Sequence, residues 1–397
     1  MSRYTVRPTG AGRPAGRAPT GLLAGEHSGG WHPRIWLGAP APGGLALPPA
    51  TPSRAWMYSP RGVFVDDAHV VVADSGNHRV LIWHGIPGGD EQPADVVLGQ
   101  PDGHTEGRAA AGRGPERGMN LPTGVAIVDG RLIVADAWHH RILIWDDVPQ
   151  TDDVAPDVVL GQPDAGSVEP NAGRPCSAQT FFWPFGVAVL GDRFWVADTG
   201  NRRVLGWEGG IPGPGEPADI VLGQPSSSAR EENRGEGVGP RSFRWPHAIA
   251  GTADLLLVAD AGDHRVLGWS PQPAGDTAAN SVLGQKDFVS AQEWPYGPHT
   301  GDRFRFPYAV DLDGDTLVIA DTANNRILIW DGLPTDPFGG RSADHVLAQP
   351  DFAANGENRW ALVGHDTLCW PYGVSLHRDV LAVADSGNNR VMLWRRS

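Results

Sequence analysis

One eleven-residue motif occurs six times at nearly equal intervals along the 397-residue chain. The copies read ADSGNHRVLIW, ADAWHHRILIW, ADTGNRRVLGW, ADAGDHRVLGW, ADTANNRILIW and ADSGNNRVMLW. The Asp of each copy stands 61 to 64 residues after the preceding one, at positions 74, 136, 198, 260, 321 and 385. A fixed period of this kind indicates a repeat architecture, so we expect one repeated structure rather than the several domains that length alone would suggest.

Each repeat contains four short apolar segments that are typical of β-strands. In the third repeat they are PFGVAVL from Pro184, RFWVAD ending at Asp198, RVLGW ending at Trp207 and DIVLGQ ending at Gln224. The segments are rich in β-branched and aromatic residues, and Gly, Pro, Asp and Asn separate them. Four antiparallel strands per repeat, repeated six times, predict an all-β fold, a six-bladed β-propeller around a central channel.

The two ends of the chain are expected to meet in the last blade. The sixth repeat ends soon after Trp394 and lacks a VLGQ strand, whereas RIWLGAP near the N-terminus matches that strand. We therefore expect an N-terminal strand to close the last blade, with Ile35 to Gly38 beside Val391 to Leu393, which removes exposed sheet edges. The expected organisation is a flexible Arg/Gly/Pro-rich tail over residues 1–33 and a single propeller over 34–397.

Composition argues against several classes of protein. The net charge of −14 makes nucleic acid an unlikely partner, because phosphate binding needs clustered Lys and Arg. The chain contains no apolar run of about 18 residues, so no membrane span is predicted, and the N-terminus has no apolar signal segment. Two cysteines, Cys176 and Cys369, cannot form a disulfide framework. These features favour a cytoplasmic protein.

The motif ADSGNHRV, preceded by P-x-G-V and an apolar strand, resembles the NHL repeat, and the resemblance covers residues 34–397. It implies a six-bladed propeller. Proteins with this repeat include binders of protein or RNA, and related propellers include metal-dependent lyases of the peptidylglycine type. The Asp, Asn and Arg of the motif recur in every blade, whereas a catalytic group should occur once. We therefore interpret these three residues as scaffold.

The connections from the fourth strand of one blade to the first strand of the next are expected to carry the function. They are about 20 residues long and differ in every blade, and variable loops on a rigid scaffold are where function usually resides. The turns between the second and third strands should lie on the same face. The six connections contain 13 Lys and Arg against 14 Asp and Glu, so this face lacks the basic excess that RNA binding requires.

Residues that break the sixfold symmetry are the candidates for a site. The residue after the Pro that opens each first strand should lie at the channel mouth: Arg61, Thr123, Phe185, His247, Tyr308 and Tyr372. Such a mixture of aromatic and polar side chains is typical of a small-molecule pocket, although it could also be mere variation at the mouth. In the second motif, Trp138 and His139 replace a small residue and Asn. We expect them to form one wall of the site, with His139 as a proton carrier, unless Trp138 packs under a neighbouring loop.

A bound transition metal is a further alternative. In the peptidylglycine lyases the Pro-His position supplies zinc ligands from several blades, and only His247 matches it here. Histidines and cysteines of the long connections could add ligands: His104, His299, His365, Cys176 and Cys369. Their spacing is not that of a zinc site, and the cysteines are more simply small buried apolar residues.

Asp311 replaces a small first-strand residue and is expected to be a hydrogen-bonded carboxylate in the channel, or else to hold a cation there.

Two functions follow from this pattern. The first is a binding or scaffold module that presents its long connections to a protein or a small-molecule ligand. The second is an enzyme at the channel mouth, a metal-assisted lyase or hydrolase that would use His247, Arg61, Tyr308 and Tyr372. The sequence identifies no cofactor, although zinc fits the second reading.

Overall fold

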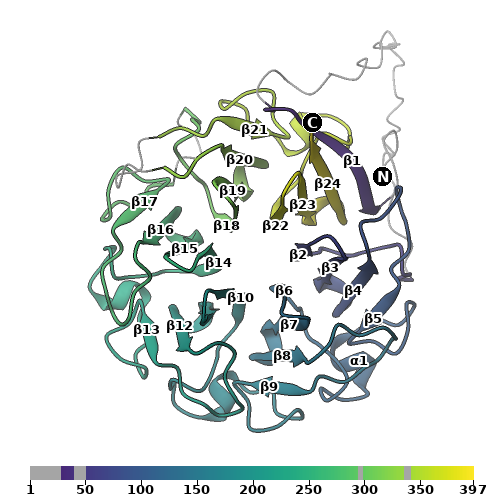
Figure 1. Ribbon diagram of the computed structural model, residues 1–397, viewed down its shortest axis with the longest axis vertical. Coiled ribbons are helices and arrows are strands. Elements are labelled where there is room, and N and C mark those ends of the chain that lie inside the picture. The colour runs from purple at the N-terminus through teal and green to yellow at the C-terminus, as the bar shows by residue number, and fades with distance from the viewer. Residues whose placement is uncertain (1–27, 40–50, 294–297, 335–340) are drawn as a thin grey trace, which may run out of the picture.

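The computed structural model describes residues 28–39, 51–293, 298–334 and 341–397, which form six four-stranded antiparallel sheets. The sheets are arranged radially around one axis, with the first strand of each repeat innermost (Figure 1). The prediction of an all-β, six-bladed β-propeller is confirmed.

The blades follow the repeats along the chain. The first blade contains β2 (Gly62–Val65), β3 (His69–Asp74), β4 (Arg79–His84) and β5 (Val96–Leu98), and the second contains β6 (Val125–Val128), β7 (Arg131–Asp136), β8 (Arg141–Trp145) and β9 (Val158–Leu160). The third contains β10 (Pro184–Leu190), β11 (Arg193–Asp198), β12 (Arg203–Glu208) and β13 (Ile220–Leu222). The fourth contains β14 (Pro246–Thr252), β15 (Leu255–Asp260), β16 (Arg265–Trp269) and β17 (Ser281–Leu283), and the fifth contains β18 (Pro307–Asp313), β19 (Thr316–Asp321), β20 (Arg326–Trp330) and β21 (His345–Leu347).

The sixth blade is built from both ends of the chain. It contains β22 (Pro371–His377), β23 (Val380–Asp385), β24 (Arg390–Arg396) and, from the N-terminal side, β1 (Trp31–Gly38). Ile35 pairs with Leu393 and Leu37 pairs with Val391, so the predicted closure is confirmed. The strand begins at Trp31 rather than at Arg34, and residues 1–27 of the expected tail lie outside the described residues.

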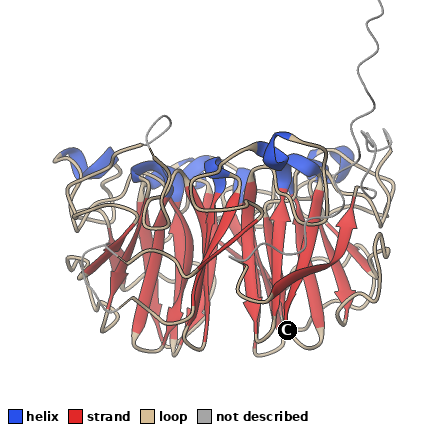
Figure 2. Ribbon diagram, turned by 90° about the horizontal axis from the view of Figure 1, so that it is seen from above, coloured by secondary structure: helices blue, strands red, loops and turns tan. Residues whose placement is uncertain are grey.

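The short helices all lie on one face of the propeller (Figure 2). Six 3₁₀ turns connect the second and third strands: η1 (Ser75–Asn77), η2 (Ala137–His139), η4 (Thr199–Asn201), η6 (Ala261–Asp263), η7 (Thr322–Asn324) and η9 (Ser386–Asn388). One short α-helix, α1 (Arg108–Gly112), and three more 3₁₀ turns lie in the connections between blades: η3 (Pro170–Gly173), η5 (Glu232–Gly235) and η8 (Glu357–Trp360). The turns and the long connections therefore share a face, as expected, and we call it the loop face.

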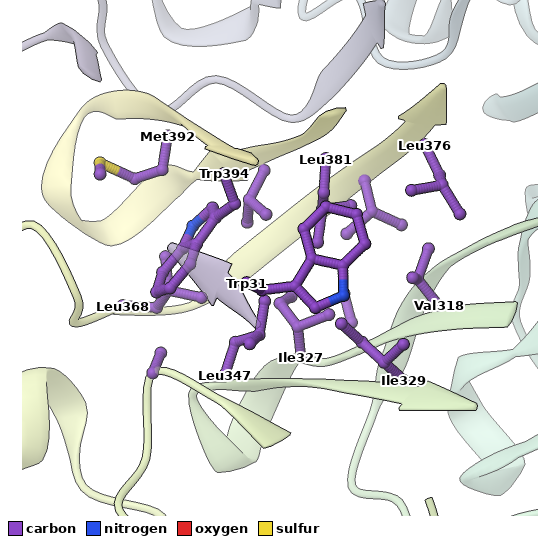
Figure 3. Packing of buried hydrophobic residues seen from close by; sticks show 14 of the residues in the cluster. Trp31, Val318, Ile327, Ile329, Leu347, Leu368, Leu376, Leu381, Met392 and Trp394 are labelled. Carbon is purple, nitrogen blue, oxygen red and sulfur yellow. The ribbon is translucent and has the colours of Figure 1, made fainter. Parts of the chain in front are cut away.

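Apolar side chains form six clusters, one between each pair of neighbouring blades. In the cluster between the fifth and sixth blades, Trp31 of β1 packs with Ile327 and Leu347 of the fifth blade and with Met392 and Trp394 of the sixth (Figure 3). Trp36 joins the same cluster, and because successive side chains of a strand point to opposite faces, Leu37 joins the cluster on the other side, against the first blade. The closing strand thus packs against both neighbours of its blade.

Among the residues with described positions, no helix is both long enough and apolar enough to cross a membrane.

Candidate functional site

The repeated Asp of the motif is the centre of a buried hydrogen-bond network. In the third blade, Asp198 Oδ2 accepts hydrogen bonds from Arg203 Nε and Asn201 Nδ2, both at 2.7 Å, and Oδ1 accepts one from Phe182 N at 2.7 Å. The other guanidinium nitrogens of Arg203 donate to carbonyl oxygens of the connections before and after the blade, including that of Thr180. The Asp–Arg pair recurs in all six blades, so these residues hold the loop face together.

His139 belongs to this scaffold, which corrects its expected place in the wall of the site. Its Nδ1 lies 2.9 Å from Asp136 Oδ2, the place that Asn201 Nδ2 takes in the third blade. The side chain is only 6% exposed, because this position of the turn points toward the buried carboxylate. We therefore leave His139 out of the site, and with it the idea of a proton carrier there.

Four of the six predicted mouth residues lie in an unbroken row of contacts around the inner end of the loop face, and a fifth extends it. The ring of His247 lies 4.4 Å from that of Phe185 and 4.5 Å from that of Tyr308. Tyr308 stacks on Tyr372 at 4.5 Å with 10° between the ring planes. The Arg61 guanidinium then lies over the Tyr372 ring, 5.2 Å from its centre. We call these five residues the mouth belt.

Trp138 fills the gap that Thr123 leaves in the mouth belt. Thr123 is buried, and its hydroxyl donates to the Phe185 carbonyl oxygen at 3.0 Å, so it lines the channel but leaves a gap in the row. Trp138, from the turn of the same blade, fills that gap. Its ring lies 5.8 Å from the Arg61 guanidinium and 6.0 Å from the Phe185 ring. It also packs against Trp183 of the long connection, at 5.3 Å, which is the packing considered as the alternative role for it.

Glycine allows neighbouring first strands to approach closely below the belt. Gly124 N donates to the Phe185 carbonyl oxygen at 2.8 Å. A Cβ at Gly124 would lie 2.4 Å from that oxygen, far inside contact distance. The P-x-G-V glycine therefore permits the close approach that brings the belt side chains of adjacent blades together.

Two connected spaces lie at this point of the molecule. The channel, of about 380 Å³, is lined by the first strands of all six blades. A second space of about 340 Å³, which we call the mouth cavity, lies on the loop-face side and shares all five belt residues with the channel. Its other lining residues come from turns and long connections: Trp138, Phe182, Trp183, Thr199, Gly200, Arg202 and Trp245. The size and the aromatic lining are typical of a small-molecule site.

The charged side chains that line the mouth cavity are all cationic. Arg61 and Arg202 line it, and no carboxylate of the described residues does. Burial, with a smaller contribution from the Arg61 charge, lowers the pKa of His247 to about 3, so its imidazole is neutral at pH 7. Burial and the neighbouring Tyr372 raise the pKa of the Tyr308 phenol, which stays protonated. The cavity is therefore cationic in a chain whose net charge is −14.

Arg202 was not identified from the sequence, although the motif contains the signal. In five blades the residue before the motif Arg is His or Asn, and its side chain accepts the backbone N–H of the residue that precedes the Pro opening the next blade. The third blade has Arg202 there, and a guanidinium cannot accept a hydrogen bond. Its replacement of an acceptor marks it as a departure from the scaffold.

The histidines and cysteines considered as extra metal ligands come from four connections, and only His365 and Cys369 share one. His104 and His299 contact a carbonyl oxygen and an amide respectively, and His365 stacks on Trp36 at 4.6 Å. Burial raises the pKa of both thiols, that of Cys369 to about 12, as expected of unreactive cysteines. Within the described ranges, no three His, Cys, Asp or Glu side chains are grouped so that they could hold a metal ion. The residues do not fit a zinc site, so we derive no chemistry from one.

Asp311 lines the channel and connects two blades. Its Oδ2 accepts the backbone N–H of Leu376 in the next blade at 2.7 Å, and its Oδ1 accepts that of Leu312 at 2.8 Å. Burial raises the pKa of this carboxyl to about 6. The equivalent Ser375 makes a similar bond to Val65 N. Asp311 is therefore a hydrogen-bonded residue of the channel lining.

Sequence comparison finds a known repeat in two of the blades. The NHL repeat family matches residues 57–83 and 119–145, which belong to the first two blades. The chain is therefore a six-bladed β-propeller in which NHL repeats are found in the first two blades.

Among individual proteins, the chain is similar to NHL repeat-containing protein 2 of Bos taurus, with 24% identity over 357 residues. The match covers 81% of this chain and 46% of that protein, so the chain spans about half the length of this relative. Solved structures with a related shape include the WD40 beta propeller domain of Doa1, with a TM-score of 0.48, 10% identity and coverage of 93% of this chain and 98% of that one. Chaetomium thermophilum Raptor gives a TM-score of 0.46, 12% identity and coverage of 93% and 29%.

Proposed function

We propose that this propeller is a binding module that takes a small molecule in the mouth cavity on its loop face. The observation that carries the proposal is the closed row of stacked side chains around the channel mouth, completed by Trp138. No packing requirement of the turn calls for a Trp, because the equivalent residue of every other blade is Gly or Ala, as at Gly200 and Ala323. A large aromatic side chain that is partly exposed at a cavity adds contact area for a ligand.

The same geometry favours binding over acid–base catalysis. A general base works best with a pKa near the operating pH, and the pKa of His247 is about 3. Tyr308 keeps its proton, and no carboxylate of the described residues reaches the mouth cavity. The residues named for the enzyme alternative thus come together at the mouth, but the lowered pKa of His247 and the raised pKa of Tyr308 suit recognition better than proton transfer near pH 7.

The variant Trp138→Ala tests the proposal, because Ala323 shows that the turn accepts Ala. A crystallographic or NMR screen of small aromatic fragments should find ligands in the mouth cavity of the wild type. We expect Trp138→Ala to weaken their binding by about 10-fold, the loss of roughly one aromatic contact, while the melting temperature changes by no more than a few degrees.

The matched control is Trp360→Ala, which removes a Trp of the loop face that is 80% exposed and lies outside the cavity. It should leave fragment binding unchanged. The proposal fails if Trp138→Ala binds the same fragments as tightly as the wild type, or if it loses stability without any change in binding.

A protein partner at the loop face is the second candidate. Trp360 and Leu362, in the connection between the fifth and sixth blades, are 80% and 68% exposed. Exposed apolar side chains of this size favour a contact with another protein. Trp360→Ala, the control above, is the variant that should weaken such a contact.

A further inference from the structure

The mouth cavity contains two guanidinium groups that are not used by the scaffold. Neither Arg61 nor Arg202 forms an ion pair with any carboxylate of the described residues, whereas the motif arginines each pair with a buried Asp. The Nε atoms of both side chains are buried and have no hydrogen-bond partner among the described residues. Buried donors without partners cost free energy unless a ligand or water satisfies them.

Arg61 contacts aromatic rings instead of a carboxylate. Its guanidinium carbon lies over the rings of Tyr372 and Trp138, 5.2 and 5.8 Å from their centres. A contact with a ring face uses none of the guanidinium N–H donors, which therefore remain available to a carboxylate or a phosphate. The two rings thus fix the orientation of a cation that is ready to bind an oxyanion.

Arg202 replaces a residue that, in each of the other five blades, accepts a hydrogen bond from the next connection. In the first, second and fourth blades, Nδ1 of His78, His140 and His264 accepts a backbone N–H of the next connection at 3.1 Å. In the fifth and sixth blades, Oδ1 of Asn325 and Asn389 does the same at 2.9 Å. Arg202 makes only long contacts, of 3.4 and 3.3 Å, to the carbonyl oxygens of Gly200 and Arg230. The side chain gives up the shared structural role and lines the mouth cavity instead.

We propose that the mouth cavity selects small aromatic molecules that carry an oxyanion, either a carboxylate or a phosphate. The flat ring stacks among the aromatic side chains, and the oxyanion receives hydrogen bonds from Arg61 and Arg202. A space of about 340 Å³ suits a ligand of one or two fused rings. This inference rests on the proposed function and adds the chemical class of the ligand.

A matched set of probes tests the selection. They are 2-naphthoate, 2-naphthyl phosphate, the neutral 2-naphthamide and the non-aromatic cyclohexanecarboxylate. Binding is measured by calorimetry and by fluorescence, since Trp138, Trp183 and Trp245 line the cavity. We expect at least one of the two naphthyl anions to bind about 10-fold or more tightly than 2-naphthamide, because charge-assisted hydrogen bonds are the stronger ones. Cyclohexanecarboxylate should bind more weakly than 2-naphthoate, because it lacks the flat ring.

Two substitutions remove one cation each. Arg202→Asn introduces the residue that Asn325 and Asn389 supply in other blades, so the variant should fold and regain the bond between blades. Arg61→Gln keeps a planar amide between the two rings. Each should weaken binding of the preferred anion by about 10-fold or more and leave 2-naphthamide within about 2-fold of the wild type. The control Arg395→Asn removes an exposed cation outside the cavity and should change neither.

The outcomes separate the two proposals. If 2-naphthamide binds as tightly as both anions, or if Arg202→Asn and Arg61→Gln leave anion binding unchanged, the inference is overturned. Binding of 2-naphthamide that Trp138→Ala weakens would then still support the proposed function. If no probe binds at millimolar concentration, the inference is also overturned, and the fragment screen decides the proposed function. Tighter binding of the phosphate or of the carboxylate supports the inference and identifies the oxyanion.

Discussion

At the scale of single residues, the buried Asp–Arg pair of each blade links several segments of the loop face through hydrogen bonds. Arg203 donates to Asp198 and to carbonyl oxygens of two different connections, and both side chains are fully buried. Removing one partner of a buried ion pair leaves the other charge uncompensated, which costs more than the pair itself contributes. The motif is therefore a requirement of folding, although it resembles a constellation of catalytic groups.

We predict that Arg203→Ala lowers the free energy of unfolding by about 3–5 kcal/mol, because it isolates the Asp198 carboxylate and releases three loop carbonyl oxygens. Chemical denaturation followed by circular dichroism measures the change. The control is Arg395→Ala, whose ion pair with Asp379 is half-exposed and should contribute less than about 1 kcal/mol. Equal and small effects of the two variants would contradict a structural role for the motif.

At the scale of elements, β1 determines whether the ring closes. It supplies the outer strand of the sixth blade, and its apolar side chains enter the clusters on both sides of that blade. The Nε1 of Trp394 shows the difference between this blade and the others. In the other five blades the equivalent Trp donates to a carbonyl oxygen of the loop that joins the third and fourth strands. No such loop follows β24, because the fourth strand comes from the N-terminal side, and Trp394 Nε1 has no partner among the described residues.

We predict that residues 28–39 function equally well when they are attached after Ser397 by a short Gly linker, in a chain that starts at Thr51. Ser397 N already donates to the Gly30 carbonyl oxygen at 3.1 Å, so the linker would form an ordinary hairpin. The permuted chain should melt within a few degrees of the original. The same chain without residues 28–39 should lose about 5 kcal/mol or more, from Trp31, Trp36 and Leu37 alone, and aggregate through the exposed edge of β24.

Thermal unfolding and size-exclusion chromatography of the three chains give the result. A shortened chain that melts at the same temperature as the original would show that β1 is not needed for closure.

At the scale of the whole molecule, the ring depends on hydrogen bonds between blades as well as on the six apolar clusters. His78, His140 and His264 each accept a backbone N–H of the following connection through Nδ1, which requires an unprotonated nitrogen. Burial lowers the pKa of all three side chains, that of His140 to about 4. Three of the five bonds of this type are therefore sensitive to acid.

We predict that His140→Asn reduces the loss of stability on acidification. Between the ordinary His pKa of about 6.5 and the folded value of about 4, the unfolded chain binds more protons than the folded one, so the free energy of unfolding falls as the pH drops. Asn accepts the same bond without titrating, as Asn325 and Asn389 do. After allowance for partial solvation, the variant should retain on the order of 2 kcal/mol that the wild type loses between pH 7 and pH 4.

Denaturation series at several pH values compare the wild type with His140→Asn and with His84→Asn, which alters an exposed histidine of β4. The His84 variant should follow the wild type. If the His140 variant did so as well, protonation of His140 would have no part in acid sensitivity.

The positions of the mouth residues could be predicted from the sequence, but their relations could not. The Pro that opens each first strand located Arg61, Phe185, His247, Tyr308 and Tyr372, because the repeat period fixes equivalent places in every blade. The period gives no side-chain direction. It could not show that Thr123 bonds to a carbonyl oxygen, that Trp138 fills the gap, or that His139 points to a buried carboxylate.

The sequence by itself determined the six blades, the strand order within them and the strand that closes the ring. These follow from apolar periodicity and turn residues, which act locally and repeat in every unit. Only the tertiary structure decided which departures from the repeat meet at one cavity. Arg61 and Arg202 belong to different blades, 141 positions apart in the chain. Neither has a carboxylate partner among the described residues, and this shared property arises from the space between blades rather than from either repeat alone.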